Sequence, residues 1–299
     1  MKKYFINLQE NRLRTGWRIL LFLVVALAMS TGFNLSVKLL GGPPEDKTIS
    51  IVARGVFVIF MATAAVGIGR RLFDRRSWIS LGLKLDRLGM LDLLMGFVLS
   101  GVMVGIIFLT LLSFGFLKVD EIGWTGSGSS PVFGILLYLF GIGAAVGWSE
   151  ELVFRGYLLQ NLRDGIGIIW AVIIMCAFYG VVHMANPNST WLSGTLIAVI
   201  GVLRIYGWLC SGQLWLSMGM HAGWNFFQGP VFGFQVSGLE NESLMRHSLS
   251  GPDWLSGGSF GPEAGIVVVP VILMALLVMF LWTARRSDTP WTKEIQKAA

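Results

Sequence analysis

Uncharged apolar runs recur along the chain at the length needed to cross a lipid bilayer. The clearest extends from Leu93 to Leu117 and is bounded by Asp92 and Lys118. A helix of about 20 residues spans the roughly 30 Å of hydrocarbon in a bilayer. Over the whole 299 residues, 54% are hydrophobic and 13% are charged, a balance that excludes an ordinary soluble protein. The sequence therefore predicts an all-α polytopic membrane helix bundle.

Charges and turn residues divide the apolar sequence into about eight predicted transmembrane helices. Two of these come from a single long run, which Asn186, Pro187 and Asn188 interrupt with residues typical of turns. A Gly/Ser stretch at 125–130 precedes the fourth, which begins at Pro131. The eight predicted spans are residues 19–37, 55–69 with an extension toward 49, 93–117, the run from 131, the two parts of 165–203, 208–228 and 264–284.

The basic residues indicate the orientation of these spans. Short cytoplasmic loops collect Lys and Arg, and an even number of spans places both chain ends on one side. Most of the 23 basic residues fall in the segments that this scheme places inside, including Arg204 between the sixth and seventh spans. We expect an integral, multi-pass protein of a bacterial cell membrane with both termini cytoplasmic. The net charge of +6 is then explained by orientation and anionic lipid, and no nucleic acid partner is expected.

Two adjacent glutamates, Glu150 and Glu151, end a long uncharged stretch. A carboxylate surrounded by apolar sequence is costly unless it is compensated. Glu151 precedes Arg155 by four residues, the favourable order for an ion pair on a helix. Glu150 points about 100° away and is left as a candidate proton acceptor. The alternative is that both are solvated charges at a wet helix end.

His183 is the strong polar group of the predicted fifth span. The midpoint of the chain between Glu150 and His183 falls in the segment 164–167, where Gly residues predict a turn. Two antiparallel helices joined there would carry Glu150 and His183 at equal depth. A lone histidine near a span end is otherwise an interfacial or packing residue.

The predicted seventh span carries His221 and Asn225, four residues apart. An imidazole and a carboxamide at this spacing share one helix face, and both are costly in lipid. They indicate a polar stripe that faces the bundle interior, although Asn225 alone could join two helices by a hydrogen bond.

These three motifs, in this order in a multi-span protein, resemble those of the CPBP family. Their form is Glu150-Glu151-x-x-x-Arg155, Tyr179-x-x-x-His183 and His221-x-x-x-Asn225. The family comprises intramembrane endopeptidases named for CAAX proteases and bacteriocin processing, and it includes the type II CAAX prenyl endopeptidases. The resemblance covers 131–228 and implies a catalytic core there. Residues 1–130 would form an N-terminal membrane region with three spans, and 229–299 a polar loop, the last span and a cytoplasmic tail. Tyr179 departs from the family, which more often has Phe at this position, and its extra hydroxyl calls for a partner.

The resemblance implies peptide hydrolysis by an activated water. Glu150, hydrogen-bonded with His183, would deprotonate the water, and His221 and Asn225 would donate to the oxyanion. Glu151 and Arg155 would form an orienting pair, with Tyr179 in support. The substrate would be a membrane protein or a membrane-associated peptide.

Three alternatives remain open from the sequence. In the first, zinc binds Glu150, His183 and His221, with water as the fourth ligand. In the second, the protein is a catalytically silent scaffold or immunity-type protein. In the third, it is a proton-coupled transporter, which should show related halves, yet the polar motifs have no second copy in the sequence.

Overall fold

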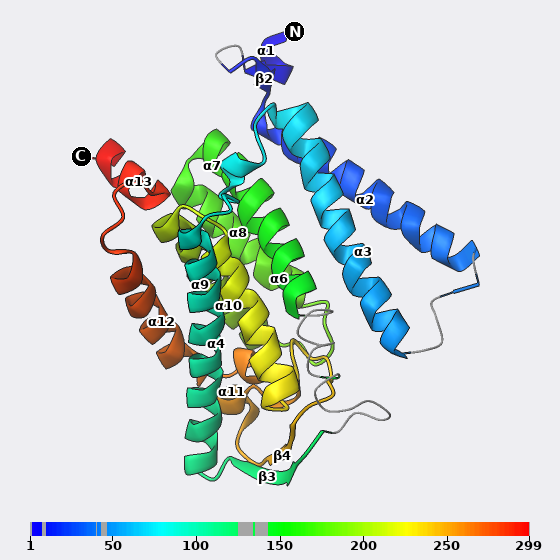
Figure 1. Ribbon diagram of the computed structural model, residues 1–299, viewed down its shortest axis with the longest axis vertical. Helices are drawn as coiled ribbons and strands as arrows, with labels where there is room; N and C mark the ends of the chain where they lie inside the picture. Colours follow the sequence, from blue (N-terminus) through cyan, green and yellow to red (C-terminus); the bar gives the residue numbers. More distant parts are fainter. Residues whose placement is uncertain are drawn as a thin grey trace.

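The computed structural model describes residues 2–7, 10–39, 41–42, 47–124, 134 and 143–298, and it is a bundle of helices with two small pairs of strands (Figure 1). The predicted all-α membrane bundle is confirmed. The helices are α1 Lys2–Phe5, α2 Thr15–Leu39, α3 Lys47–Ile68, η1 Gly69–Asp74, η2 Ile79–Leu81, α4 Arg87–Ser113, α6 Ala145–Glu150, η4 Glu151–Leu158, α7 Leu159–Ile166, α8 Ile168–His183, α9 Trp191–Ser211, α10 Trp215–Phe226, η5 Phe227–Val231, α11 Asp253–Ser256, η6 Gly258–Phe260, η7 Pro262–Ala264, α12 Val268–Thr283 and α13 Pro290–Ala298. The strands are β1 Ile6–Asn7, β2 Arg12–Leu13, β3 Leu117–Ile122 and β4 Met245–Leu249.

In the described part of the chain, four helical segments are long and apolar enough to cross a membrane. They are Thr15–Leu39, Ile49–Asp74, Arg87–Ser113 and Trp191–Ser211, and α8 and α12 are shorter apolar helices. The start of the predicted fourth span at Pro131, the loop at 125–130 and the domain boundary at 130/131 lie outside the described residues. Both chain ends lie at the same end of the bundle, near α7 (Figure 1).

The predicted boundary between the sixth and seventh spans is wrong. We expected a cytoplasmic connection around Arg204, but α9 continues through this residue to Ser211 and leaves Arg204 buried. Gly212, with φ of 75°, ends the helix instead, and α10 begins three residues later. The helix can continue through a charge because Glu151 and Tyr179 compensate the guanidinium inside the bundle.

Helices α4 and α10 pack tightly against each other, because glycines allow their backbones to approach closely. A side chain at Gly219 would overlap the carbonyl oxygen of Leu93, and one at Gly96 would overlap that of Leu216. Small residues at such crossings permit van der Waals contact between helices in a membrane, where apolar burial alone gives little driving force. This contact fixes the height and rotation of the helix that carries His221.

The predicted turn at 164–167 is found at the loop end of a long helical hairpin. Helix α6 runs without a break through the π-helical segment η4 into α7, and α8 begins after Gly167, which has φ of 82°. The second half of the chain thus presents two polar motifs on adjacent antiparallel helices. Trp148 of α6 also donates through Nε1 to the hydroxyl of Thr63 in α3, at 2.8 Å. This hydrogen bond joins helices α2 and α3 to the hairpin formed by α6, α7 and α8.

The polar segment after α10 forms an ordered cap at the other end of the bundle. Its strand β4 pairs with β3, which follows α4, in an antiparallel ladder with an irregularity between Val119 and Glu121. We expected a polar loop here, and the ladder was not predicted. The pairing was invisible in the sequence because its two strands are more than 100 residues apart.

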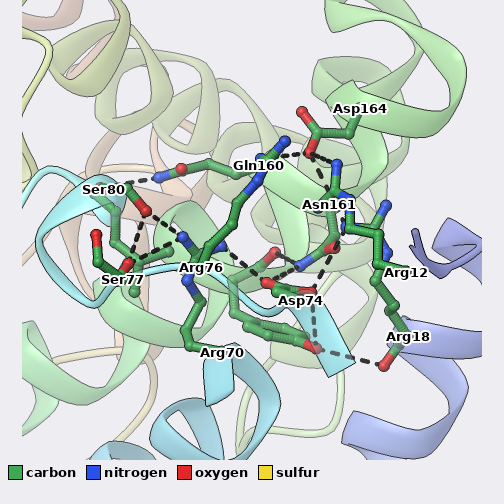
Figure 2. A network of polar contacts seen from close by, with 12 residues as sticks. Arg12, Arg18, Arg70, Asp74, Arg76, Ser77, Ser80, Gln160, Asn161 and Asp164 are labelled. Atoms are coloured by element: carbon green, nitrogen blue, oxygen red, sulfur yellow. Dashed lines mark hydrogen bonds and ion pairs between the residues drawn. The ribbon is translucent and has the colours of Figure 1, made fainter. Parts of the chain in front are cut away.

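A network of charged side chains lies at the end of the bundle that holds both termini (Figure 2). Asp74, at the end of η1, is buried beside the guanidinium groups of Arg18 and Arg70. Asp164, at the end of α7, accepts from Arg12 at 2.9 Å and from Arg76 at 2.7 Å. The network therefore links the N-terminal segment and α2 to the end of α3 and to the hairpin formed by α6, α7 and α8.

Candidate active site

A cavity of about 970 Å³ collects the polar residues that the sequence singled out. Its walls come from α3, α6, α8, α9, α10 and the cap, so all three predicted segments of the chain contribute to it. Among the residues that line it are Glu150, Tyr179, His183, His221 and Asn225. The predicted site residues on three separate helices are thus brought to one space.

Glu151 is the fully buried anion behind this cavity. Its Oε1 lies 3.2 Å from Nη1 of Arg155, as the spacing of four residues predicted, although the helix is π-helical here. The same oxygen lies 2.8 Å from Nδ1 of His221 and 3.7 Å from Nη1 of Arg204. One carboxylate therefore holds side chains from three helices, and a dry charge of this kind is tolerated only with such compensation.

The contact with Glu151 sets the tautomer of His221. An ionised carboxylate only accepts hydrogen bonds, so Nδ1 of His221 carries the proton and donates. Nε2 is then the acceptor nitrogen of the neutral ring, and it lies 3.9 Å from Oε2 of Glu150. His221 can donate into the cavity once Nε2 has taken a proton, and Glu151 is placed to stabilise the resulting imidazolium.

Glu150 is the more accessible of the two glutamates and meets Tyr179. The Tyr179 hydroxyl lies 3.0 Å from Oε2 of Glu150. The side chains of Glu150 and His183, both of which the structure describes, do not form the predicted hydrogen bond with each other. Tyr179, which lies one helical turn before His183, is the partner of Glu150 instead. The π-helical η4 explains the difference, because wider turns rise less per residue and shorten the arm from the loop to Glu150.

His183 nevertheless faces the same cavity as Glu150. Its Nδ1 lies 2.8 Å from the backbone carbonyl oxygen of Tyr179. Since a carbonyl oxygen only accepts, this nitrogen donates and Nε2 of the neutral ring is the free acceptor. His183 can therefore hold a water through Nε2 beside Glu150.

Two charged residues that line the cavity escaped the sequence reasoning. Arg204 donates from Nη1 to the Tyr179 hydroxyl at 2.7 Å and lines the cavity. Glu263 accepts from Nε1 of Trp224 at 2.9 Å and from the backbone and hydroxyl of Ser237, which ties the cap to α10. The signal for Arg204 was a lone charge within an apolar run. The positive-inside pattern led us to assign this charge to a cytoplasmic connection instead of to the interior of a helix. Glu263 sits in a polar segment, and nothing local set it apart.

The zinc alternative requires Glu150, His183 and His221 to converge. Among the described residues, no group of three His, Cys, Asp or Glu side chains has the geometry to hold a metal ion. Nδ1 of each histidine is also engaged by a protein acceptor, which leaves Nε2 of each as the candidate donor atom. These three side chains do not form a metal centre in this arrangement.

Comparison with known protein families gives an independent result. Residues 130–227 match the Rce1-like family model, described as type II CAAX prenyl endopeptidase Rce1-like. This membrane-protease match confirms for that segment the relationship to the CPBP family that the three motifs indicated. Comparisons with curated proteins and with solved structures returned no significant match.

Proposed function

We propose that this protein is an intramembrane endopeptidase that hydrolyses a peptide bond of a membrane-associated polypeptide. The observation that carries the proposal is the joint placement of Glu150, His183, His221 and Asn225 around one cavity. Behind the cavity, the buried carboxylate of Glu151 forms ion pairs with Arg155 and Arg204. The Rce1-like match over 130–227 supports the same assignment.

In the proposed reaction, water attacks the peptide carbonyl carbon while a proton passes from the water to Glu150. Nε2 of His183 accepts a hydrogen bond from the same water and orients it. The carbonyl oxygen becomes an oxyanion beside Asn225, whose carboxamide donates to it, and beside Nε2 of His221 when that ring is protonated. Collapse of the tetrahedral intermediate breaks the C–N bond, and the proton on Glu150 moves to the leaving amine.

Glu151 has a separate task in this reaction. It does not face the substrate, since it is fully buried and its Oε1 is occupied by Arg155 and His221. By accepting from Nδ1, it fixes the orientation of the His221 ring and stabilises the ring's positive charge when Nε2 is protonated. This is the electrostatic preorganisation that favours a charged transition state.

The Glu150→Gln variant tests the proposal. Cells that lack the chromosomal copy are complemented with the wild type, with Glu150→Gln, or with Glu121→Gln, and new termini of membrane polypeptides are compared by mass spectrometry. Glu121 is exposed on β3 and pairs with Arg246, and it matches the chemical change at a residue that does not itself line the cavity. We expect termini that depend on the wild type to persist with Glu121→Gln and to fall by about 10²-fold or more with Glu150→Gln. Identical termini in all three strains, at equal protein levels, would contradict the assignment.

Metal dependence is measured on the same purified, active protein. The proposed reaction predicts that zinc content is substoichiometric and that cleavage survives prolonged chelation. A different result would be stoichiometric zinc, with cleavage lost on chelation and restored by added zinc. That result would show that a bound metal, and not Glu150, is the primary group that activates the water.

A further inference from the structure

Arg204 is a buried cation whose hydrogen-bond and ion-pair partners lie beside the proposed reaction centre. Its side chain is 6% exposed and lies within α9, between apolar residues. A guanidinium in this setting requires acceptors, because it cannot be deprotonated. The structure supplies two: the Tyr179 hydroxyl at 2.7 Å and Oε1 of Glu151 at 3.7 Å from Nη1.

The Tyr179 hydroxyl therefore has a fixed polarity. Arg204 has only donors, so the hydroxyl oxygen must accept from it. The single hydroxyl proton is then directed to Oε2 of Glu150, 3.0 Å away. The hydrogen bonds run in one direction, from Arg204 through Tyr179 to Glu150.

The ring of Tyr179 is held as firmly as its hydroxyl. The guanidinium carbon of Arg155 lies 4.4 Å from the ring centroid, and Phe154 packs against it edge to face at 5.4 Å. A cation over the face of an aromatic ring is attracted to it, and the attraction is stronger when both are desolvated. The phenol thus has little freedom to turn its hydroxyl away from Glu150.

We propose that Arg204 is a positioning residue that orients Glu150 through the hydroxyl of Tyr179. The inference rests on the proposed function and deepens it. With Oε2 occupied by the Tyr179 hydroxyl, Oε1 of Glu150 is the oxygen that takes the proton from water. Arg204 lines the cavity, but its Nη1 is directed to Tyr179 and Glu151, and in this scheme it contacts neither the attacking water nor the scissile bond. A phenylalanine at position 179 would remove the link and leave Arg204 with Glu151 alone.

The test is a double-mutant cycle with Arg204→Met, Tyr179→Phe and the double variant. The probe is a synthetic peptide that covers a cleavage site found in the comparison of termini above, assayed with full-length protein in detergent–lipid micelles. We expect each single variant to lose about 10- to 100-fold in kcat, the range for a small misplacement of a reacting group, with KM changed less than about threefold. The double variant should be no slower than the slower single one, because both break the same link. Arg204→Lys, which keeps a charged donor, should recover part of the loss.

Three results would overturn the inference. The first is an unchanged kcat in folded Arg204→Met. The second is an equal loss from Arg204→Met in the Tyr179→Phe background and in the wild type, which would show that Arg204 acts through Glu151 instead. The third is a loss confined to KM. Folding is monitored by the thermal midpoint of each variant.

The double variant also covers the case in which a single variant fails to fold. It removes the buried donor and its acceptor together, which costs less stability than leaving one of them unpaired. Wild-type kcat in the folded double variant would then overturn the inference, and a loss of about 10- to 100-fold would support it. Failure of the proposed function is distinguishable, because no cleavage site dependent on Glu150 would be found at all.

Discussion

Asp74 lies at the centre of the charged network that joins helices α2 and α3 to the hairpin formed by α6, α7 and α8 (Figure 2). Its carboxylate is fully buried, with Oδ2 at 2.8 Å from Nη1 of Arg70 and Oδ1 at 3.5 Å from Nη1 of Arg18. Both guanidinium groups are themselves buried. Asn161 also donates to Oδ2, at 3.2 Å. Asp74→Asn keeps the size of this side chain and removes its charge.

The expected loss follows from the two cations left behind. Removing one partner of a buried ion pair costs about 3–5 kcal/mol, because the remaining charge is buried without compensation. The new carboxamide retains one acceptor oxygen for Arg70 or Asn161, so we expect the lower end, about 3 kcal/mol. A typical protein has about 5–15 kcal/mol of total stability, so this loss should be readily measured.

The assay is equilibrium unfolding of purified protein in mixed micelles, with the denaturing detergent increased in steps and helix content followed by circular dichroism. Asp288→Asn is the matched control, because Asp288 pairs with Lys293 at 2.7 Å while 85% exposed, and we expect a change below about 1 kcal/mol. Asp74→Asn combined with Arg70→Met should be less destabilised than Asp74→Asn alone. The reasoning is refuted if Asp74→Asn and Asp288→Asn lose the same amount.

Two further perturbations test the packing and the charges outside the membrane. Gly219→Ala should lower the thermal midpoint strongly, because its Cβ would overlap the carbonyl oxygen of Leu93. Gly105→Ala should have little effect, because a Cβ there meets nothing nearer than 3.7 Å. Equal thermal midpoints of the two variants would contradict the close crossing of α4 and α10. Burial would raise the pKa of Asp164, but the hydrogen bond from Arg12 and the nearby arginine charges outweigh it and lower the pKa. The contribution of Asp164 to stability is therefore complete above its unfolded pKa near 4 and is lost as the pH falls through its folded pKa. At pH values below about 4, the thermal midpoint of the wild type should decrease, and that of Asp164→Asn should decrease less steeply.

The sequence was most informative wherever a contact lies within one helix or one hairpin. Four residues along a helix return to the same face, and Glu151 and Arg155 therefore pair as predicted. Gly167 lacks a Cβ and can take the positive φ at which the hairpin turns. The rarity of charge inside the apolar runs also singled out Glu150, His183 and His221, which line the cavity, since an uncompensated charge in lipid is expensive.

Contacts between helices depend on their rotation and height, which the sequence does not specify locally. The π-helical turns after Glu150 moved its partner from His183 to Tyr179, a shift of one helical turn. Arg204 looked like an ordinary cytoplasmic arginine until α9 was placed beside Tyr179.

The sequence by itself thus determined the membrane-spanning class, the hairpin and five of the polar residues that line the cavity, Glu150, Tyr179, His183, His221 and Asn225. Only the tertiary structure decided which carboxylate is buried, which nitrogen of each histidine faces the cavity, and how Arg204 reaches Glu150 through a tyrosine. The physical reason is that the cost of burying a polar group is a property of that residue, whereas the partner that offsets the cost is chosen by the packing of separate helices.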